Sequence, residues 1–503
     1  MATELLYIDL FCGAGGTSTG VERARFDGGK CARVIACVNH DANAIASHAA
    51  NHPNARHFTE DIRTFDIGPL KQLAIRERGN NPDAKVVLWA SLECTNHSRA
   101  KGGMSRDADS RTLAEHLFRY IEELRPDYIQ IENVVEFMEW GPLRVRIVHD
   151  PQTGTDSCPL DVKHDRKRKS VTVAPVWIPD PEQKGTLYRK WVEEVCARGY
   201  RFDHRVLNSA DFGAYTARVR YFGLFARTGL PMVWPRPTHA RKPTTDMFSG
   251  CLKPWRAVRE VLDFGDRGES IFTRRKPLVD ATLNRIYAGL VKFVAGGQDA
   301  FLVKWNLVNS KTGKYIAPDL DAPCPTVATQ NRLGVASVNF LSKQYGGDPN
   351  GKNIGVDGPA GTITTVDHHA FLSAYYGNGY NVSVDGPAPT LTTKDRFQVV
   401  RPSYLVEVEQ GRPAWKIRPE DTPAMCRIKE FCALYGIVDI TMRMLRISEM
   451  KRIQGFGDDY VLVGTQEEQK KYLGNAVVTQ VATAMCEALA GALTGLKTCR
   501  QTS

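Results

Sequence analysis

Short apolar runs, each followed by small or polar residues, recur through the first part of the chain. They cover residues 5–10, 33–38, 86–89 and 128–131. A continuous apolar run of about four to eight residues is typical of a strand that is buried on both faces. Helical patterns lie between these runs. Strands that alternate with helices predict a doubly wound α/β fold with a mostly parallel sheet.

The helices are predicted from apolar residues that recur at helical spacing. The clearest pattern places apolar residues from Leu113 to Leu124 on one face of a helix. The capping residues Asp109-Ser110 precede this helix, and Pro126 follows it. Further helices are expected at residues 20–25, 42–48, 187–198 and 479–493. The last of them has enough apolar positions to pack back on the sheet of the first domain.

A glycine-rich turn follows the first predicted strand directly. It reads Phe11-Cys12-Gly13-Ala14-Gly15-Gly16-Thr17 and leads into a helix. Glycines let the backbone approach a ligand closely, and the N-terminus of the helix faces that ligand. The spacing of the three glycines is not the dinucleotide pattern, so we expect another adenosine-bearing ligand. A tight structural turn is the alternative.

Polar residues also follow the next strands. The second strand ends at Asn39-His40-Asp41, where this class of fold places a polar group for a ribose. For Asp41 alone, capping the following helix is an equally good interpretation. Asp61 is a candidate to hold an adenine amino group, with Ile62 beside it, or it sits in a plain turn.

Cys94 lies on a loop after the run at 86–89, and Gly102 and Gly103 follow in the same loop. The carboxyl end of a buried strand is where an open α/β sheet places its chemistry, so the thiol is a candidate nucleophile. Taken alone, a buried structural cysteine is the commoner interpretation.

Two regions break the α/β rhythm. Residues 140–185 hold several prolines and the charged run at 165–169, and we interpret them as an inserted, solvated arm. The charged run is either a solvent-exposed surface or a contact for a phosphate backbone. Residues 228–440 carry an Asp-x-Pro-x-x-Thr repeat that begins at Asp321, Asp357 and Asp385. Each copy leads into β-branched residues, which predicts a separate, mostly β domain.

Composition narrows these possibilities. The net charge of +10 over 503 residues permits a polyanionic partner without requiring one. The 12 cysteines contain no C-x-x-C pair, so no metal site is expected, and scattered thiols suggest a reducing compartment. We find no signal-peptide pattern and no apolar run near the ~20 residues of a membrane span. The protein is therefore expected in the cytoplasm.

Five stretches resemble the motifs of the cytosine-C5 methyltransferase family that uses S-adenosylmethionine, and they follow the family's order. They are Asp9 to Gly16, Glu132-Asn133-Val134, Arg218-x-Arg220, Arg443 to Phe456, and Gly474 to Val477. The resemblance implies a Rossmann-like methyltransferase sheet with a second, mostly β target-recognition domain. It also implies a catalytic domain at 1–227, the target-recognition domain at 228–440, and a segment at 441–503 that returns to the catalytic domain.

The resemblance also assigns roles. Cys94 would attack a flipped-out cytosine covalently, Glu132 would act at its N3, and Arg218 and Arg220 would stabilise its O2 and hold the phosphate. The cofactor S-adenosylmethionine would be held by Asp9, Phe11, Cys12, Gly13, Ala14, Gly15, Gly16, Thr17, Asn39, His40, Asp41, Asp61, Ile62, Asn475, Ala476 and Val477. We expect a sequence-specific DNA (cytosine-5-)-methyltransferase that acts as a monomer on double-stranded DNA. Its context would be a bacterial or phage restriction-modification or defence system.

Several positions depart from the family pattern. Glu93-Cys94-Thr95 replaces Pro-Cys-Gln, Thr216 replaces a glutamine, His40 falls where an acidic residue grips the ribose, and Ala476 replaces a serine. Two alternatives therefore stay open. One is a catalytically impaired DNA-binding or regulatory homologue, and the other is a tRNA cytosine-5 methyltransferase. The long region at 228–440 counts against the tRNA alternative.

Overall fold

The chain forms two compact units. Unit 1 comprises residues 1–207, 219–236 and 481–503, and unit 2 comprises residues 208–218 and 237–480. The predicted domain boundaries, after residues 227 and 440, differ from this division because residues 441–480 belong to unit 2. The computed structural model describes residues 4–92, 113–149, 154–165, 170–243, 252–263, 269–291, 300–305, 324–325, 333–337, 371–374, 379–380, 397–400, 407–409, 412–434, 437 and 439–501.

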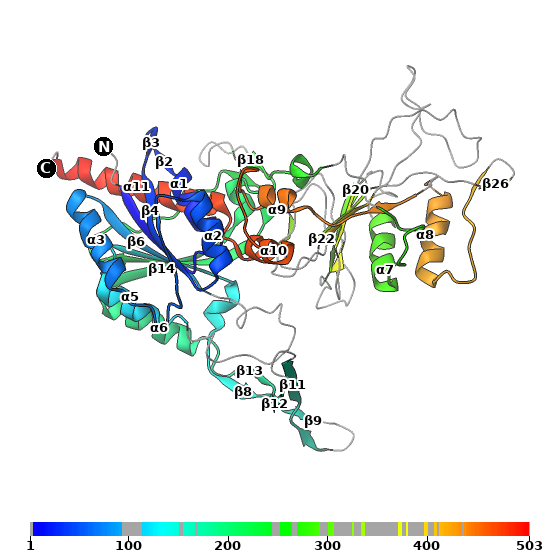
Figure 1. Ribbon diagram of the computed structural model, residues 1–503, viewed down its shortest axis with the longest axis horizontal. Coiled ribbons are helices and arrows are strands. Elements are labelled where there is room, and N and C mark those ends of the chain that lie inside the picture. The colour runs from blue at the N-terminus through cyan, green and yellow to red at the C-terminus, as the bar shows by residue number, and fades with distance from the viewer. Residues whose placement is uncertain are drawn as a thin grey trace. The chain divides into compact units, whose positions relative to one another are not determined.

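A seven-stranded sheet forms the centre of unit 1 (Figure 1). Its order is β14 (Tyr200–Asn208), β16 (Val219–Arg227), β7 (Tyr128–Asn133), β6 (Lys85–Ser91), β1 (Leu5–Leu10), β4 (Ala32–Asn39) and β5 (Arg56–Thr59). The pairs β1–β4, β1–β6, β4–β5 and β6–β7 are parallel, whereas β16 runs antiparallel to β7. The predicted doubly wound, mostly parallel sheet is confirmed. Successive strands are added first on one side of β1 and then on the other, so a topological switch point lies between β1 and β6.

Helices cover both faces of this sheet (Figure 1). They are α1 (Gly16–Arg23), α2 (Ala42–Asn51), α3 (Gly68–Asn80), α5 (Leu117–Leu124), α6 (Thr186–Ala197) and α11 (Thr479–Gln501). Side chains alternate along β1 as the period of a strand requires. Leu6, Ile8 and Leu10 join the core beneath α3, α5 and α6, whereas Tyr7 and Asp9 lie outside that cluster.

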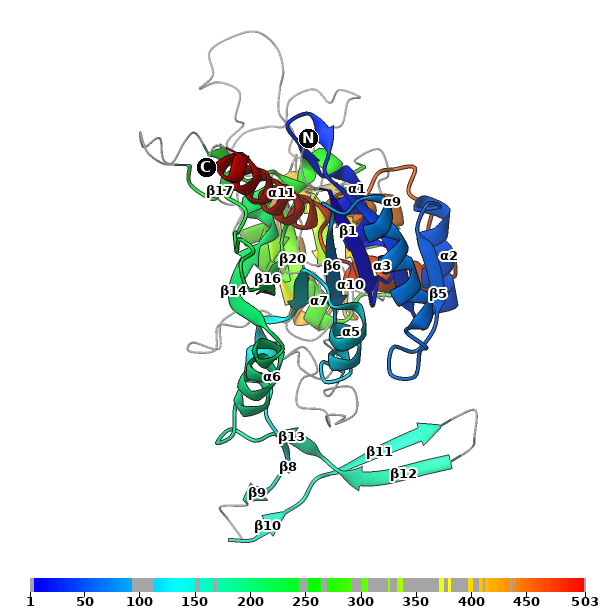
Figure 2. The ribbon, with the colours of Figure 1, turned by 90° about the vertical axis from the view of Figure 1, so that its left-hand side faces the viewer.

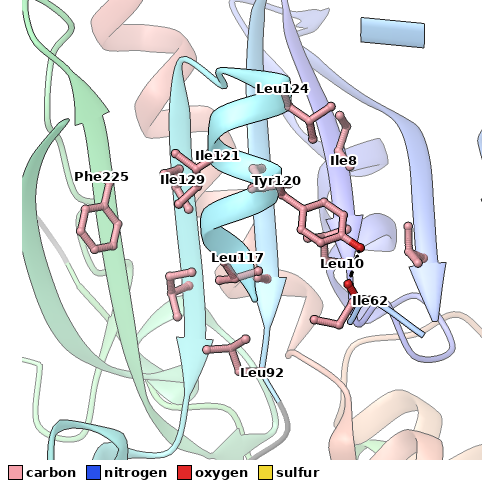
Figure 3. Close-up of a cluster of buried hydrophobic side chains, with 14 of the residues drawn as sticks. Ile8, Leu10, Ile62, Leu92, Leu117, Tyr120, Ile121, Leu124, Ile129 and Phe225 are labelled. Carbon is pink, nitrogen blue, oxygen red and sulfur yellow. Dashed lines mark hydrogen bonds between the residues drawn. The ribbon is translucent and has the colours of Figure 1, made fainter. Parts of the chain in front are cut away.

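Helix α5 shows how this core is filled. Leu117, Ile121 and Leu124 pack with the strand residues of the same cluster, as Figure 3 shows. The Tyr120 hydroxyl donates a hydrogen bond of 2.8 Å to the Ile62 carbonyl, so its polar end is satisfied within the core. The predicted apolar face is therefore present, while the expected cap at 109–110 lies outside the described residues.

Strand β5 and helix α3 were not predicted from the sequence. In α3 only Leu70, Leu73 and Ala74 are buried, and most of the other side chains are polar. Three buried apolar positions over a helix of 13 residues give a weak periodic signal. Packing against the core, rather than local pattern, accounts for this helix.

Helix α11 belongs to unit 1 from residue 481 onward. Its buried side chains include Val481, Met485 and Cys486, and the Thr483 hydroxyl donates to the Gly20 carbonyl at 2.9 Å. Contrary to expectation, the stretch at residues 466–495, which covers the helix at Gln466–Asn475 and most of α11, has the length and composition of a membrane span. Of its most apolar window, 56% is buried inside the protein, as in a core helix.

The region at 140–185 forms three short antiparallel pairs (Figure 2). Their strands are β8 (Leu143–Val145), β9 (Val148–His149), β10 (Asp156–Ser157), β11 (Leu160–Asp165), β12 (Ser170–Pro175) and β13 (Trp177–Pro179). Residues 166–169 of the charged run lie outside the described residues. A further small hairpin joins β2 (Arg25–Phe26) and β3 (Gly29–Lys30).

Unit 2 contains a five-stranded sheet, in the order β22 (Leu333–Ser337), β25 (Phe397–Val400), β23 (Phe371–Ala374), β20 (Ala300–Trp305) and β24 (Gly379–Tyr380). Its helices are α7 (Asp280–Gly289), α8 (Pro423–Leu434), α9 (Ile447–Ile453) and α10 (Gln466–Asn475). Its shorter strands are β15 (Thr216–Ala217), β17 (His239–Ala240), β18 (Lys253–Pro254), β19 (Glu269–Ser270), β21 (Cys324–Pro325), β26 (Glu407–Glu409), β27 (Arg412–Ala414) and β28 (Thr441–Met442). Apart from Cys324 and Pro325, the predicted repeats lie outside the described residues.

A buried ion pair stabilises the last part of unit 2. Arg443 donates two hydrogen bonds to the Glu449 carboxylate, at 2.9 and 2.7 Å. The same carboxylate accepts from the backbone N–H groups of Asp263 and Arg446, at 2.7 and 2.8 Å. Because every partner is in place, the cost of burying these charges is offset by well-formed hydrogen bonds.

Trp191 tests the core of unit 1. Its side chain is 2% exposed, stacks edge-on against Phe137 and Phe225, and donates to the Ala114 carbonyl at 2.8 Å. We expect Trp191→Ala to lower the free energy of unfolding by about 3–5 kcal/mol, because it leaves a large cavity. The control Trp177→Ala, at a side chain that is 39% exposed, should cost less than about 1 kcal/mol. Urea titrations followed by circular dichroism measure both, and equal losses would contradict this core assignment.

Candidate active site

The glycine-rich turn lies at the carboxyl end of β1, beside the switch point of the sheet. Phe11, Gly13 and Gly15 have positive φ angles of 59°, 52° and 99°. The turn is held by hydrogen bonds from Cys12 N to the Val38 carbonyl, at 3.3 Å, and from Gly15 N to the Cys12 carbonyl, at 3.0 Å. A Cβ atom at Gly13 would meet no heavy atom within 4 Å, so the turn borders open space there.

Phe11 and Gly13 are the partly exposed residues of this turn, and its other members are buried. Asp9 is fully buried beneath the turn, and its Oδ2 atom accepts a hydrogen bond of 2.8 Å from the Ser18 hydroxyl. Burial raises the pKa of Asp9 to about 8, although the bond from Ser18 opposes this shift. Asp9, which was predicted to contact a cofactor, therefore lies where it anchors helix α1 to β1. Thr17 is buried as well.

The ends of β4 and β5 carry the polar residues predicted for an adenosine. Asp41 caps helix α2, since one of its carboxylate oxygens accepts from the N–H groups of Asn43 and Ala44 at 3.0 and 3.1 Å. The side chain of Asn39 accepts from the Asp41 N–H at 2.9 Å, and His40 is exposed. These two hydrogen bonds are those expected of Asp41 as the N-cap of α2.

Asp61 forms a turn after β5 and binds Arg63. The two side chains approach to 2.5 Å, and the hydrogen bonds from Arg63 lower the pKa of Asp61 to about 2. Ile62 is buried in the core and presents its carbonyl to Tyr120. A carboxylate at Asp61 is therefore present at the strand end, already paired with a neighbouring cation.

Glu132 lies at the carboxyl end of β7 and is 5% exposed. Its Oε1 atom is 3.4 Å from Nε of Arg220, which is 9% exposed. In the sheet, Glu132 pairs with Ser91 of β6 on one side and with Phe222 of β16 on the other. A buried carboxyl group and a buried guanidinium group therefore meet beside the strand that leads toward Cys94. Cys94 itself lies outside the described residues.

The Arg-x-Arg pair is divided between the two units. Arg220 belongs to unit 1, whereas Arg218 belongs to unit 2, where it is buried. Its guanidinium donates to the Gly474 carbonyl at 3.0 Å. Arg218 thus supports the turn that carries Asn475, Ala476 and Val477.

That turn joins α10 to α11, and it is braced from a second direction. Gln454 is fully buried, and its amide donates to the Leu473 carbonyl at 2.8 Å. The Thr479 hydroxyl donates to the carbonyl of Gly455, whose φ is 86°. No role is predicted for Gln454 from the sequence, although it lies in one of the five motifs.

A buried cluster of thiols and imidazoles, which was not predicted from the sequence, lies beneath the glycine-rich turn. Cys12, Cys37 and His48 converge there, and His57 adjoins them. Burial raises the pKa of the Cys37 thiol, but hydrogen bonds with Cys12, His48 and His57 outweigh burial and hold this pKa below its ordinary value. These four residues come from separate elements, so no local spacing indicated them.

Comparisons with known proteins add the following. A sequence profile of the C-5 cytosine-specific DNA methylase family matches residues 5–140 and 367–491, which is more than half of the chain. Arg218 and Arg220 fall between the two matched stretches.

Individual relatives match shorter parts of the chain. Type II methyltransferase M.AgeI of Thalassovita gelatinovora is 34% identical over 129 residues, which are 25% of this chain and 27% of that protein. Type II methyltransferase M.XorII of Xanthomonas oryzae pv. oryzae is 28% identical over 244 residues, 47% of this chain and 44% of that protein. The chain thus spans less than half the length of these two relatives. The crystal structure of S. pombe Dnmt2 methyltransferase aligns with a TM-score of 0.45 at 13% identity, covering 98% of this chain and 99% of that one.

Proposed function

Since the chain belongs to the C-5 cytosine-specific DNA methylase family, we propose that it transfers a methyl group to C5 of cytosine within a specific sequence of duplex DNA. Its relatives M.AgeI and M.XorII carry the name Type II methyltransferase, which supports a restriction-modification role in a bacterial cytoplasm. A cognate restriction or defence protein is the partner expected in that setting. The enzyme acts as a monomer on DNA in this proposal.

S-adenosylmethionine supplies the transferred methyl group. The turn after β1 suits it, because Phe11 is partly exposed and Gly13 borders open space at the switch point of a parallel sheet. Asn39 and His40 at the end of β4, and Asp61 at the end of β5, complete the rim in unit 1. The buried residues Asp9 and Thr17 act as positioning residues, since they hold the turn from below.

The chemistry requires a nucleophile, because C5 of cytosine reacts poorly with an electrophile. When the Cys94 thiolate bonds to C6, electron density moves toward N3 and O2, and C5 becomes nucleophilic. With the cofactor bound, C5 would take its methyl group, and the bond from that methyl to the sulfonium sulfur would break and leave S-adenosylhomocysteine. A carboxyl group at N3 hydrogen-bonds or protonates the ring, which is the role proposed for Glu132. The C5 proton then leaves to a base or water, the C6–S bond breaks, and the thiolate is expelled.

One observation carries the proposal, namely the place of Glu132 in the sheet. Its carboxyl group is buried next to Arg220 and is in register with Ser91. Cys94 follows Ser91 by three residues. Three residues extend a chain by at most about 11 Å, which limits how far along the chain from Ser91 the nucleophile can act. A target base must leave the duplex to reach both groups.

The charge of Arg220 has two consequences in this arrangement. It compensates the carboxylate of Glu132 in a site where an unpaired charge would be costly. It also offers N–H donors beside the position where negative charge develops on the base. Arg218 serves as a positioning residue, because its described hydrogen bond holds the turn that carries Asn475 to Val477.

The Cys94→Ala variant tests the reaction. We expect it to abolish transfer of label from S-adenosylmethionine to duplex DNA, while binding of S-adenosylhomocysteine is retained. The matched control is Cys158→Ala, at an exposed thiol of the arm. Label found only in tRNA would overturn the proposed substrate. If the unaltered protein binds DNA but labels neither nucleic acid, the regulatory alternative replaces the enzyme.

The Glu132→Gln variant tests the acid. It should lower the rate of methyl transfer at least ~10²-fold, the usual contribution of a positioned general acid. Single-turnover kinetics with a cytosine-containing duplex provide the measurement. Glu182→Gln, at an exposed residue before α6, should leave the rate unchanged. Near-normal turnover of the Glu132 variant would assign proton transfer to another group.

A pair of glycines separates cofactor binding from stability. Gly13 and Gly28 both have positive φ, and an added Cβ would meet nothing within 4 Å at either position. Each change to alanine should therefore cost a similar ~1–2 kcal/mol of stability, from backbone strain alone. Calorimetric titration with S-adenosylhomocysteine should show weaker binding for Gly13→Ala and unchanged binding for Gly28→Ala. Equal affinities for the two variants would contradict the proposal that the cofactor binds at the turn.

A further inference from the structure

Four side chains with metal-binding atoms converge beneath the glycine-rich turn of unit 1. Cys12 comes from the turn, Cys37 from β4, His48 from α2 and His57 from β5. Cys12, Cys37 and His48 are buried, and His57 is partly buried. We propose that these residues form a structural zinc site, which the proposed methyl-transfer chemistry does not use.

Three of the four side chains bring their ligand atoms close enough to share one ion, and His57 adjoins them. The ligand atoms of Cys12, Cys37 and His48 all lie within 4.8 Å of one another. Sγ of Cys37 is 3.6 Å from Nδ1 of His48, which is 2.9 Å from Nε2 of His57. Ordinary Zn–S and Zn–N bond lengths require about 3.8 Å between two sulfurs, about 3.5 Å between sulfur and nitrogen, and about 3.3 Å between two nitrogens. The two contacts of His48 therefore need to change by only a few tenths of an ångström.

A hydrogen-bond relay prepares His48 to act as a ligand. The Ser18 hydroxyl donates a hydrogen bond to Asp9, and its oxygen lies 2.8 Å from Nε2 of His48. The Ser18 oxygen can therefore accept a hydrogen bond from the Nε2–H of His48. In that tautomer the lone pair of Nδ1 faces the sulfurs. Metal-ligating histidines characteristically donate their other ring N–H in this way, which fixes both tautomer and ring orientation. The Asp9–Ser18–His48 relay supplies that outer shell.

The donor set selects the ion and its role. Two thiolates with two imidazoles suit Zn²⁺, whereas Mg²⁺ and Ca²⁺ prefer oxygen ligands. Four protein ligands leave no open position, so the ion is structural rather than catalytic. Zinc binds thiolates, so any proton still carried by the two cysteines is released to solvent on binding. The ion links the turn to β4, α2 and β5, which are the elements whose ends rim the proposed cofactor site.

Metal content tests the site independently of methyl transfer. The full chain, purified under reducing conditions with zinc in the growth medium, should carry about one zinc per chain, as expected of a buried four-ligand site. Replacement of the metal by Co²⁺ should give thiolate-to-cobalt charge transfer and the intense visible bands of a tetrahedral centre. Removing the metal with a chelator should lower the melting temperature, and adding zinc back should restore it.

Two variants and one control complete the experiment. Cys37→Ser and His57→Gln should each reduce bound zinc at least about tenfold and change the cobalt spectrum, since each removes a ligand. His57 is partly exposed, so its variant is expected to fold even if the buried Cys37 variant does not. Cys196→Ser, at a thiol of α6 outside the cluster, should keep its zinc.

Three results would overturn the site. One is a folded, reduced protein that holds no zinc and gives no thiolate bands with Co²⁺. Another is a Cys12–Cys37 disulfide in the metal-free protein as purified, which would make the pair a redox couple. The third is unchanged metal content in the Cys37 and His57 variants. None of these results bears on whether Cys94 transfers a methyl group, so the two proposals fail separately.

Discussion

The parallel pairing of β1 with β4 and β6 is the constraint on which unit 1 depends. Parallel strands bring all their carboxyl ends to one edge of the sheet, so loops that are far apart in sequence meet there. The turn after β1, the polar residues after β4 and β5, and Glu132 at the end of β7 all lie at this edge. The sheet is buried on both faces by helices, which gives these loops a rigid base.

Polar groups under this edge are buried in a connected set rather than singly. Asp9 binds Ser18, Ser18 binds His48, and His48 faces both Cys37 and His57. A lone buried carboxyl or imidazole would lose several kcal/mol of hydration without return, whereas a connected network recovers much of that loss. The network also fixes the position of helix α1 relative to β1. The shape of the glycine-rich turn is thereby defined from below as well as by its own backbone.

Unit 2 also contains buried polar groups that bind one another or the backbone, at the segments that resemble family motifs. Arg443 and Glu449 form a bidentate pair, Arg218 binds the carbonyl of Gly474, and Gln454 binds that of Leu473. These bonds are made to buried backbone or to one another. Within the described residues, then, several motif positions hydrogen-bond to a turn or to one another. A motif identifies such residues without saying whether each holds a turn or faces a ligand.

The sequence by itself determined the strands at the centre of unit 1, the glycine-rich turn and the family, because each depends on local pattern. Continuous apolar runs indicate buried strands, and positive φ angles favour glycine. The polar helix α3 was missed, since its burial comes from packing rather than periodicity. Only the tertiary structure decided that Asp9 lies under the turn, that Arg220 lies beside Glu132, and that two cysteines converge with two histidines. The physical reason is that strand register and helix packing determine which distant side chains become neighbours, and neither can be read from the spacing of residues along the chain.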